Sequence, residues 1–211
     1  MELQEVPVAP FCEVVSVEDC LAAGRRFGYP FVLKNALLAY DGRGNVVVRS
    51  AEVIEECFTR LGGEGLYAEQ FVPFAKELAV MVVRTRPEGG TEDDMMCFPL
   101  VETLQRDGIC DTVVCPAQVP ESVRESALAV ARQAVGCLRG QGVFGVELFM
   151  LPDGQILYNE IAPRPHNSGH YTIESCEMDQ FEMHLRAVAS LPCPPPALRV
   201  PHALMVNIIG Q

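Results

Sequence analysis

Two apolar runs at residues 143–151 and 155–160 flank a Pro-Asp-Gly tripeptide at 152–154. An Asp-Gly pair between such runs is the strongest short-range signal for a β-hairpin. With Asp and Gly as the two central residues of the turn, Glu147 stands directly opposite Glu160. The sequence therefore predicts two antiparallel strands that bring a pair of carboxylates face to face.

This pairing is unfavourable by itself, because like charges roughly 5 Å apart on neighbouring strands destabilise a hairpin. A divalent cation would remove the repulsion, and Mg²⁺ favours one or two carboxylates together with water and substrate phosphates. The alternative is a solvated strand face that carries both glutamates. The hairpin alone leaves both interpretations open.

The residues that follow favour a binding site. Residues 159–171 combine Glu160, Arg164, His166, His170 and two amide side chains in a stretch too rich in proline for a helix. Arginine and histidine supply hydrogen-bond donors for anions, and they lie next to the paired carboxylates in sequence. We therefore interpret the hairpin and this segment together as a metal and anion site.

Composition limits the classes of protein to which the chain can belong. Its 211 residues suffice for one large domain or two small ones, and 49% hydrophobic with 21% charged residues is ordinary for a globular fold. No window approaches the run of about 18 apolar residues of a membrane span, so we expect no membrane insertion. A net charge of -12 argues against non-specific nucleic-acid binding.

The first residues and the cysteines indicate where in the cell the protein is expected. The start of the chain lacks the basic and apolar regions of a signal peptide. The nine cysteines include no Cys-x-x-Cys pair, which predicts reduced thiols. We expect a cytoplasmic location, or a plastid if the chain comes from a plant lineage.

The remaining pattern alternates between short strands and helices. Ser16 is placed to cap a helix at 17–27, with Asp19 as in a capping box and Gly28 at its end, and Ser50 is expected to cap a helix to residue 61. This order indicates an α+β fold with antiparallel sheets and flanking helices. Further strands are expected at 31–34, 46–49, 66–71, 77–86, 96–104 and 109–115, and further helices at 120–139 and 174–190.

Five segments, in order along the chain, carry a resemblance to a known family: residues 28–34 (GYPFVLK), 39–45 (AYDGRGN), 68–77 (AEQFVPFAKE), 143–147 (VFGVE) and 159–174. The chain resembles the ATP-grasp enzymes there. Among them it is most similar to the 5-(carboxyamino)imidazole ribonucleotide synthetases of purine biosynthesis, and in particular to the fungal and plant type.

The resemblance implies the ATP-grasp fold and a division of the chain. It implies a small lid subdomain at 1–71, a large subdomain with the metal and substrate site at 72–192, and the start of a C-terminal segment at 193–211. The N-terminal βαβ domain and the final C-terminal subdomain of such enzymes are expected to be missing. The mutase domain that is fused to fungal and plant relatives is likewise expected to be missing.

For ATP, the resemblance implies that Lys34 neutralises phosphate, that the glycine-rich loop at 39–45 closes over the phosphates, and that the backbone of residues 69–72 contacts adenine. Glu77 would hydrogen-bond the ribose. Taken singly, these residues also suit an ordinary strand or a plain hairpin turn. The expected ATP contacts are Lys34, Ala39, Tyr40, Gly42, Arg43, Gly44, Asn45, Glu69, Val72, Glu77 and Asn159.

The resemblance also assigns Glu147 and Glu160 as Mg²⁺ ligands, as the hairpin had suggested, with Asn159 beside them. Regular alternation puts Asn159 on the opposite face of the strand from Glu160, so we expect the strand to end or bulge there. The expected catalytic residues are Asp41, Arg164 and His166. The expected substrate contacts are Asn167, Ser168, Gly169 and His170.

The implied reaction is ATP-dependent carboxylation of 5-aminoimidazole ribonucleotide by bicarbonate through carboxyphosphate, with Mg²⁺ as the metal. A homodimer is compatible with the resemblance. One alternative is another ATP-grasp ligase, such as a biotin-carboxylase-like or glycinamide ribonucleotide enzyme, but those enzymes do not share residues 164–170 in this form. Another is a catalytically incompetent ATP-binding fragment that serves as a scaffold.

Overall fold

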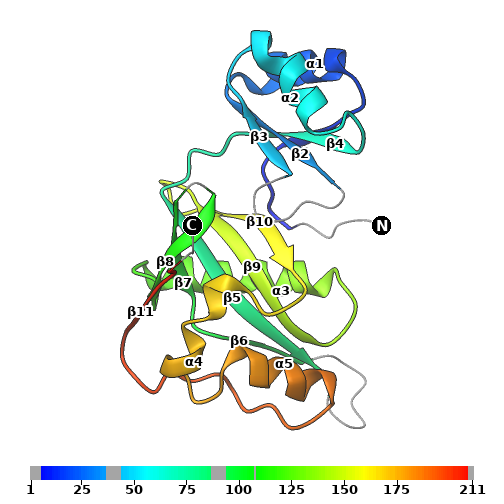
Figure 1. Ribbon diagram of the computed structural model, residues 1–211. Coiled ribbons are helices and arrows are strands. Elements are labelled where there is room, and N and C mark those ends of the chain that lie inside the picture. Colours follow the sequence, from blue (N-terminus) through cyan, green and yellow to red (C-terminus); the bar gives the residue numbers. More distant parts are fainter. Residues whose placement is uncertain (1–5, 37–43, 87–93, 107, 209–211) are drawn as a thin grey trace. The chain divides into compact units, whose positions relative to one another are not determined.

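The computed structural model describes residues 6–36, 44–86, 94–106 and 108–208 (Figure 1). The chain divides into two compact units, the smaller of which is Ala9–Pro73. The larger unit comprises Met1–Val8 and Phe74–Gln211. The expected division into a lid subdomain at 1–71, a large subdomain at 72–192 and the start of a C-terminal segment at 193–211 stays a prediction.

The smaller unit contains a four-stranded antiparallel sheet covered on one face by helices. The strands β1 (Phe11–Val14), β4 (Leu66–Gln70), β2 (Phe31–Asn35) and β3 (Asn45–Val48) lie in that order. Alternate residues such as Phe31 and Leu33 are buried with residues of α1 (Val17–Phe27) and α2 (Ile54–Arg60). Because strand side chains alternate, Lys34 lies on the other face of this sheet.

Helix α1 begins and ends at the expected residues. The Ser16 hydroxyl accepts a hydrogen bond from the Asp19 N–H over 3.2 Å, and the Asp19 carboxylate accepts from the Val15 N–H, which confirms the capping interaction. Gly28 has a φ of 78° and ends the helix. The second expected cap is wrong, since Ser50 makes no capping bond and precedes the short 3₁₀ turn η1 (Ala51–Val53).

The larger unit is built on one sheet whose two faces are both covered. Its strands β10 (Ile156–Ala162), β9 (Gly142–Met150), β5 (Lys76–Thr85), β7 (Val101–Arg106), β8 (Ile109–Cys115) and β11 (Ala203–Val206) lie in that order, and β6 (Asp94–Cys97) pairs with β5. All these pairs are antiparallel, which confirms the α+β class.

Successive residues of β5 face opposite cores. Leu78, Val80 and Val82 are buried with α3 (Glu121–Gly136). Ala79 and its alternate neighbours are buried with α5 (Gln180–Val188), and Figure 1 shows these two helices on the larger unit. Within the described parts of the chain, no helix is long and apolar enough to cross a membrane.

Two elements expected to be continuous are interrupted. The strand expected at 96–104 is divided into β6 and β7 around Pro99, which has no N–H to donate to a ladder. The helix expected at 174–190 is divided into α4 (Thr172–Ser175) and α5, because Glu177 leaves the helix and its N–H donates to Ala197. Asp179 then caps α5 by accepting from the N–H groups of Phe181 and Glu182.

Candidate active site

The hairpin of β9 and β10 confirms the predicted pairing of Glu147 with Glu160. The turn itself differs from the prediction. Leu151 donates its N–H to the Gln155 carbonyl oxygen over 2.8 Å, so the loop has three residues and ends at Gly154 with a φ of 87°. A three-residue loop shifts the register by one residue, and a second irregularity restores it before the glutamates.

That irregularity lies between Tyr158 and Glu160, where the register of β10 against β9 shifts. The residue between them is Asn159, so the expected bulge is present. A bulge interrupts the alternation of side chains. This removes the geometric objection to Asn159 acting beside Glu160, although its role stays a prediction.

Three carboxylates lie on one face of the larger sheet. Ala79 pairs directly with Glu147, and Glu77 lies two residues along the same strand, so it shares the face of Glu147. Burial, followed by the charges of Glu160 and Glu77, raises the pKa of Glu147 to about 8. Burial also raises the pKa of Glu77. The site therefore concentrates negative charge where solvation is poor, which is the condition that a bound cation relieves.

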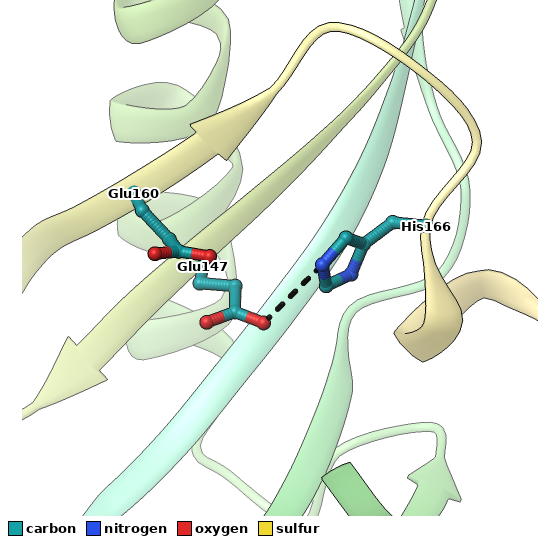
Figure 2. A group of neighbouring side chains, drawn as sticks. All are labelled: Glu147, Glu160 and His166. Atoms are coloured by element: carbon teal, nitrogen blue, oxygen red, sulfur yellow. Dashed lines mark ion pairs between the residues drawn. The ribbon is translucent and has the colours of Figure 1, made fainter. Parts of the chain in front are cut away.

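The imidazole of His166 completes the cluster (Figure 2). His166 Nε2 lies 3.7 Å from Glu147 Oε1, and the side chains are 13% and 17% exposed. One ligand atom from each of Glu147, Glu160 and His166 lies within 4.8 Å of the others. Two carboxylates and an imidazole form a donor set that fits a divalent cation.

His166 is held by residues that the sequence analysis did not identify. The Gln180 amide accepts from the His166 N–H over 2.9 Å and donates to the His166 carbonyl oxygen over 2.8 Å. Gln180 is fully buried at the start of α5. Helical spacing from Met183 and Ala187 places it on the buried face, and a buried amide requires partners, so this signal could have found it.

The other residues of the segment have different surroundings. Arg164 is exposed, and its guanidinium donates to the Pro165 carbonyl oxygen over 3.0 Å. Asn167 accepts from the Asn207 amide over 2.9 Å, and the His170 ring stacks on Phe181.

Ser168 and Gly169 are buried next to this cluster. Ser168 contacts His166 Nδ1 at 2.9 Å, and a Cβ atom added to Gly169 would lie 2.4 Å from the Gln180 amide oxygen. Both residues therefore shape the backbone that presents His166. Substrate binding by Asn167, Ser168, Gly169 and His170, like the catalytic role of Arg164, stays a prediction.

In the smaller unit, Lys34 forms an ion pair with Glu69 in which Nζ and Oε1 are 2.8 Å apart. Their side chains are 11% and 15% exposed. Asn45 pairs with Lys34 across β2 and β3, Gly44 is buried, and Val72 is half-buried. The expected contacts Ala39, Tyr40, Asp41, Gly42 and Arg43 lie outside the described residues.

Comparison with known proteins finds a matching family model and similar relatives. The family model described as the ATP-grasp domain matches residues 1–181. A phosphoribosylaminoimidazole carboxylase of Schizosaccharomyces pombe is 46% identical over 215 residues, which cover 100% of this chain and 38% of that protein. An N5-carboxyaminoimidazole ribonucleotide synthase of Synechococcus elongatus is 43% identical, and the match covers 97% of this chain and 50% of that protein.

Solved structures of such synthases are also similar to this chain. A carboxyaminoimidazole ribonucleotide synthase of Aspergillus clavatus, complexed with ATP, superposes with a TM-score of 0.89 at 44% identity, covering 97% of this chain and 53% of that one. An N5-carboxyaminoimidazole synthase from the same organism, in complex with ADP and 5-aminoimidazole ribonucleotide, gives a TM-score of 0.87 at 41% identity, covering 98% and 53%. The chain thus spans about half the length of these structures.

Proposed function

The chain belongs to the ATP-grasp family, and on that premise we propose that it forms the core of an ADP-forming ligase that carboxylates 5-aminoimidazole ribonucleotide with bicarbonate. The observation that carries the proposal is the cluster of Glu147, Glu160 and His166 on one face of the larger sheet. The names of the similar proteins support this substrate and this reaction. The reaction is that of complete enzymes, and this chain covers about half the length of the solved structure that it matches.

ATP binding is the first part of the proposal, and the ATP and ADP complexes of similar proteins support it. Lys34 would supply positive charge to the phosphates after leaving Glu69, to which it is paired here. The backbone from Glu69 to Val72 would bind the adenine edge. Glu77 would accept hydrogen bonds from the ribose. Its carboxyl is partly buried and poorly solvated, so hydrogen bonds from a ligand would replace those lost from water.

Mg²⁺ is the second part. Glu147 and Glu160 would hold it, with Asn159 beside them, since paired carboxylates of raised pKa suit a cation. When bound, Mg²⁺ neutralises negative charge on the phosphoryl group that is transferred.

In the reaction, a bicarbonate oxygen attacks the γ-phosphorus of ATP, the bond to the bridging oxygen of ADP breaks, and carboxyphosphate forms. The exocyclic amine of the imidazole nucleotide then attacks the carboxyl carbon, and phosphate leaves. Arg164 and His166 would donate hydrogen bonds to the oxyanions that develop. Asn167, Ser168, Gly169 and His170 would position the nucleotide, and Asp41 would act within the glycine-rich loop.

The test is ADP release by the purified chain with Mg²⁺ and ATP, measured with and without bicarbonate and 5-aminoimidazole ribonucleotide. We expect release that depends on both substrates and that is lost in Glu147→Gln. The matched control is Glu125→Gln, because Glu125 is exposed on α3. ATP binding without any ADP release would support the alternative of a nucleotide-binding fragment. ADP release at the same rate with and without both substrates would contradict the proposed reaction.

A further inference from the structure

We propose that two buried residues, Ser168 and Gln180, position the His166 imidazole for the reaction. They place the ring hydrogen on Nε2 and direct this N–H toward Glu147. The inference deepens the proposed function and rests on it, since it identifies what allows His166 to donate a hydrogen bond there. Figure 2 shows the imidazole facing Glu147 from the segment before the 3₁₀ turn η2 (Asn167–Gly169).

Gln180 fixes the backbone of His166 from the start of α5. Its amide oxygen accepts from the His166 N–H over 2.9 Å, and its amide nitrogen donates to the His166 carbonyl oxygen over 2.8 Å. The Gln180 N–H donates to the Thr172 hydroxyl over 3.0 Å, and this hydroxyl donates to the Gly169 carbonyl oxygen over 2.6 Å. A buried network in which each of these groups has a partner holds the backbone rigidly.

Two glycines leave the space into which His166 fits. A Cβ atom at Gly145 would lie 2.5 Å from His166 Cβ, and one at Gly169 would lie 2.4 Å from the Gln180 amide oxygen. Gly145 precedes Glu147 by two residues on β9, so the imidazole lies against the face of the sheet that carries this glutamate. His166 is therefore held between β9 and α5, with close packing on both sides.

The contacts of Nδ1 determine where the ring hydrogen lies. The Ser168 N–H donates to His166 Nδ1 over 3.4 Å, so this nitrogen presents a lone pair and carries no hydrogen. The Ser168 hydroxyl lies 2.9 Å from the same nitrogen, and it must therefore donate in this contact. The hydrogen of the imidazole then lies on Nε2, which is 3.7 Å from Glu147 Oε1.

An N–H at this position suits a group that stabilises developing negative charge. The other tautomer would present a lone pair here and would repel an oxyanion, whereas a fixed N–H attracts it without reorganisation. Glu147 and Glu160 are then left to the proposed cation, and His166 donates beside them. Because Ser168 is fully buried, its part in positioning the nucleotide would pass through His166.

The nitrogen resonances of the ring test the position of the hydrogen without any activity. The chain has four histidines, so the pair of ¹⁵N ring signals that disappears in His166→Gln is assigned to His166. In wild type at neutral pH, we expect Nδ1 in the range of an unprotonated ring nitrogen and Nε2 in the range of a protonated one. A hydrogen on Nδ1, in the neutral or the doubly protonated ring, would overturn the inference.

Ser168→Ala removes the hydroxyl donor and keeps the backbone. We expect its His166 signals to move toward a mixture of tautomers. The kcat of substrate-dependent ADP release should fall at least about tenfold, while the KM for ATP changes less than about twofold. Ser175→Ala is the matched control, because Ser175 is also buried and its hydroxyl donates to the Tyr171 carbonyl oxygen. This control should leave the ring signals and kcat unchanged.

Gln180→Met keeps the approximate size of the side chain but removes both hydrogen bonds to the His166 backbone. We expect kcat to fall at least about tenfold, because the imidazole is no longer held in place. Unchanged ring signals and kcat in folded Ser168→Ala and Gln180→Met would overturn the inference, and the wild-type signals decide it if neither variant folds. Substrate-independent ADP release by wild type would count against the proposed function alone, since the ring signals do not depend on turnover.

Discussion

At the level of single residues, the buried carboxyl of Glu147 is expected to make the proposed Mg²⁺ binding depend on pH. Its pKa of about 8 means that it holds a proton at neutral pH in the metal-free protein. A cation must displace that proton, so we expect Mg²⁺ affinity to rise toward about tenfold per pH unit below pH 8 and to level off above it. Calorimetric titration across this range measures the dependence, and an affinity that is flat from pH 6 to 8 would contradict it.

The same carboxyl affects stability. Because its folded pKa lies above the ordinary value of 4.5, its contribution to stability is complete below pH 4.5 and is lost as pH rises toward 8. We expect Glu147→Gln to stabilise the metal-free chain by about 1 to 2 kcal/mol at pH 8.5 and by nearly nothing at pH 4.5. Urea unfolding at the two pH values measures this difference, and the exposed-site control Glu125→Gln should stay within about 0.5 kcal/mol.

At the level of elements, Arg84 joins β5 to the end of α3. It is 2% exposed, and its guanidinium donates to the carbonyl oxygens of Val135, Leu138 and Gly140 over 2.6 to 2.9 Å. These are carbonyl groups at and beyond the last turn of the helix, which need donors when buried. The guanidinium also lies over the Phe144 ring at 4.9 Å.

We therefore expect Arg84→Met to lower the free energy of unfolding by about 3 kcal/mol, because three carbonyl oxygens lose a charged donor, and the hydrogen bond to Val135 is fully buried. Arg124→Met is the matched control, since Arg124 is exposed in the first turn of the same helix, and it should change stability by less than about 0.5 kcal/mol. Urea denaturation followed by circular dichroism compares them. Equal stability of the two variants would show that Arg84 does not hold the helix end.

The hairpin shows how far sequence determines an element. The Asp-Gly signal located it, but the loop contains one residue more than predicted, and the bulge at Asn159 compensates. Both are backbone features that an apolar pattern does not encode. Likewise, the apolar periodicity of residues 174–190 continues through the point where Glu177 bonds to Ala197, a contact with a distant segment that no local pattern reveals.

The pairing of Glu147 with Glu160 was predictable, because the turn signal and the two apolar runs place them opposite each other. The contacts that position His166 were not predictable, because they come from residues that fill or leave space. Gln180 and Gly145 position His166 through contacts across 14 and 21 residues of sequence. Such residues look like ordinary helix and strand positions until the packing is known.

At the level of the whole molecule, the chain is acidic and the nucleotide proposed to bind to it is an anion. The net charge is -12, and Lys34 and Lys76 are its lysines. Lys76 is paired with Glu102 at 2.5 Å, and Lys34 with Glu69. We expect removal of Mg²⁺ with a chelator to weaken ATP binding at least about tenfold, because the carboxylate cluster then repels the phosphates. Calorimetry with and without chelator measures this, and equal affinities would contradict it.

The central claim is that bicarbonate, not water, attacks ATP in this site. The most direct measurement uses ¹⁸O-labelled bicarbonate with ATP, Mg²⁺ and 5-aminoimidazole ribonucleotide, followed by mass analysis of the released phosphate. Transfer of one bicarbonate oxygen through carboxyphosphate predicts one ¹⁸O atom in each phosphate that accompanies ADP. Phosphate without label would show that the chain hydrolyses ATP with water, and would contradict the account.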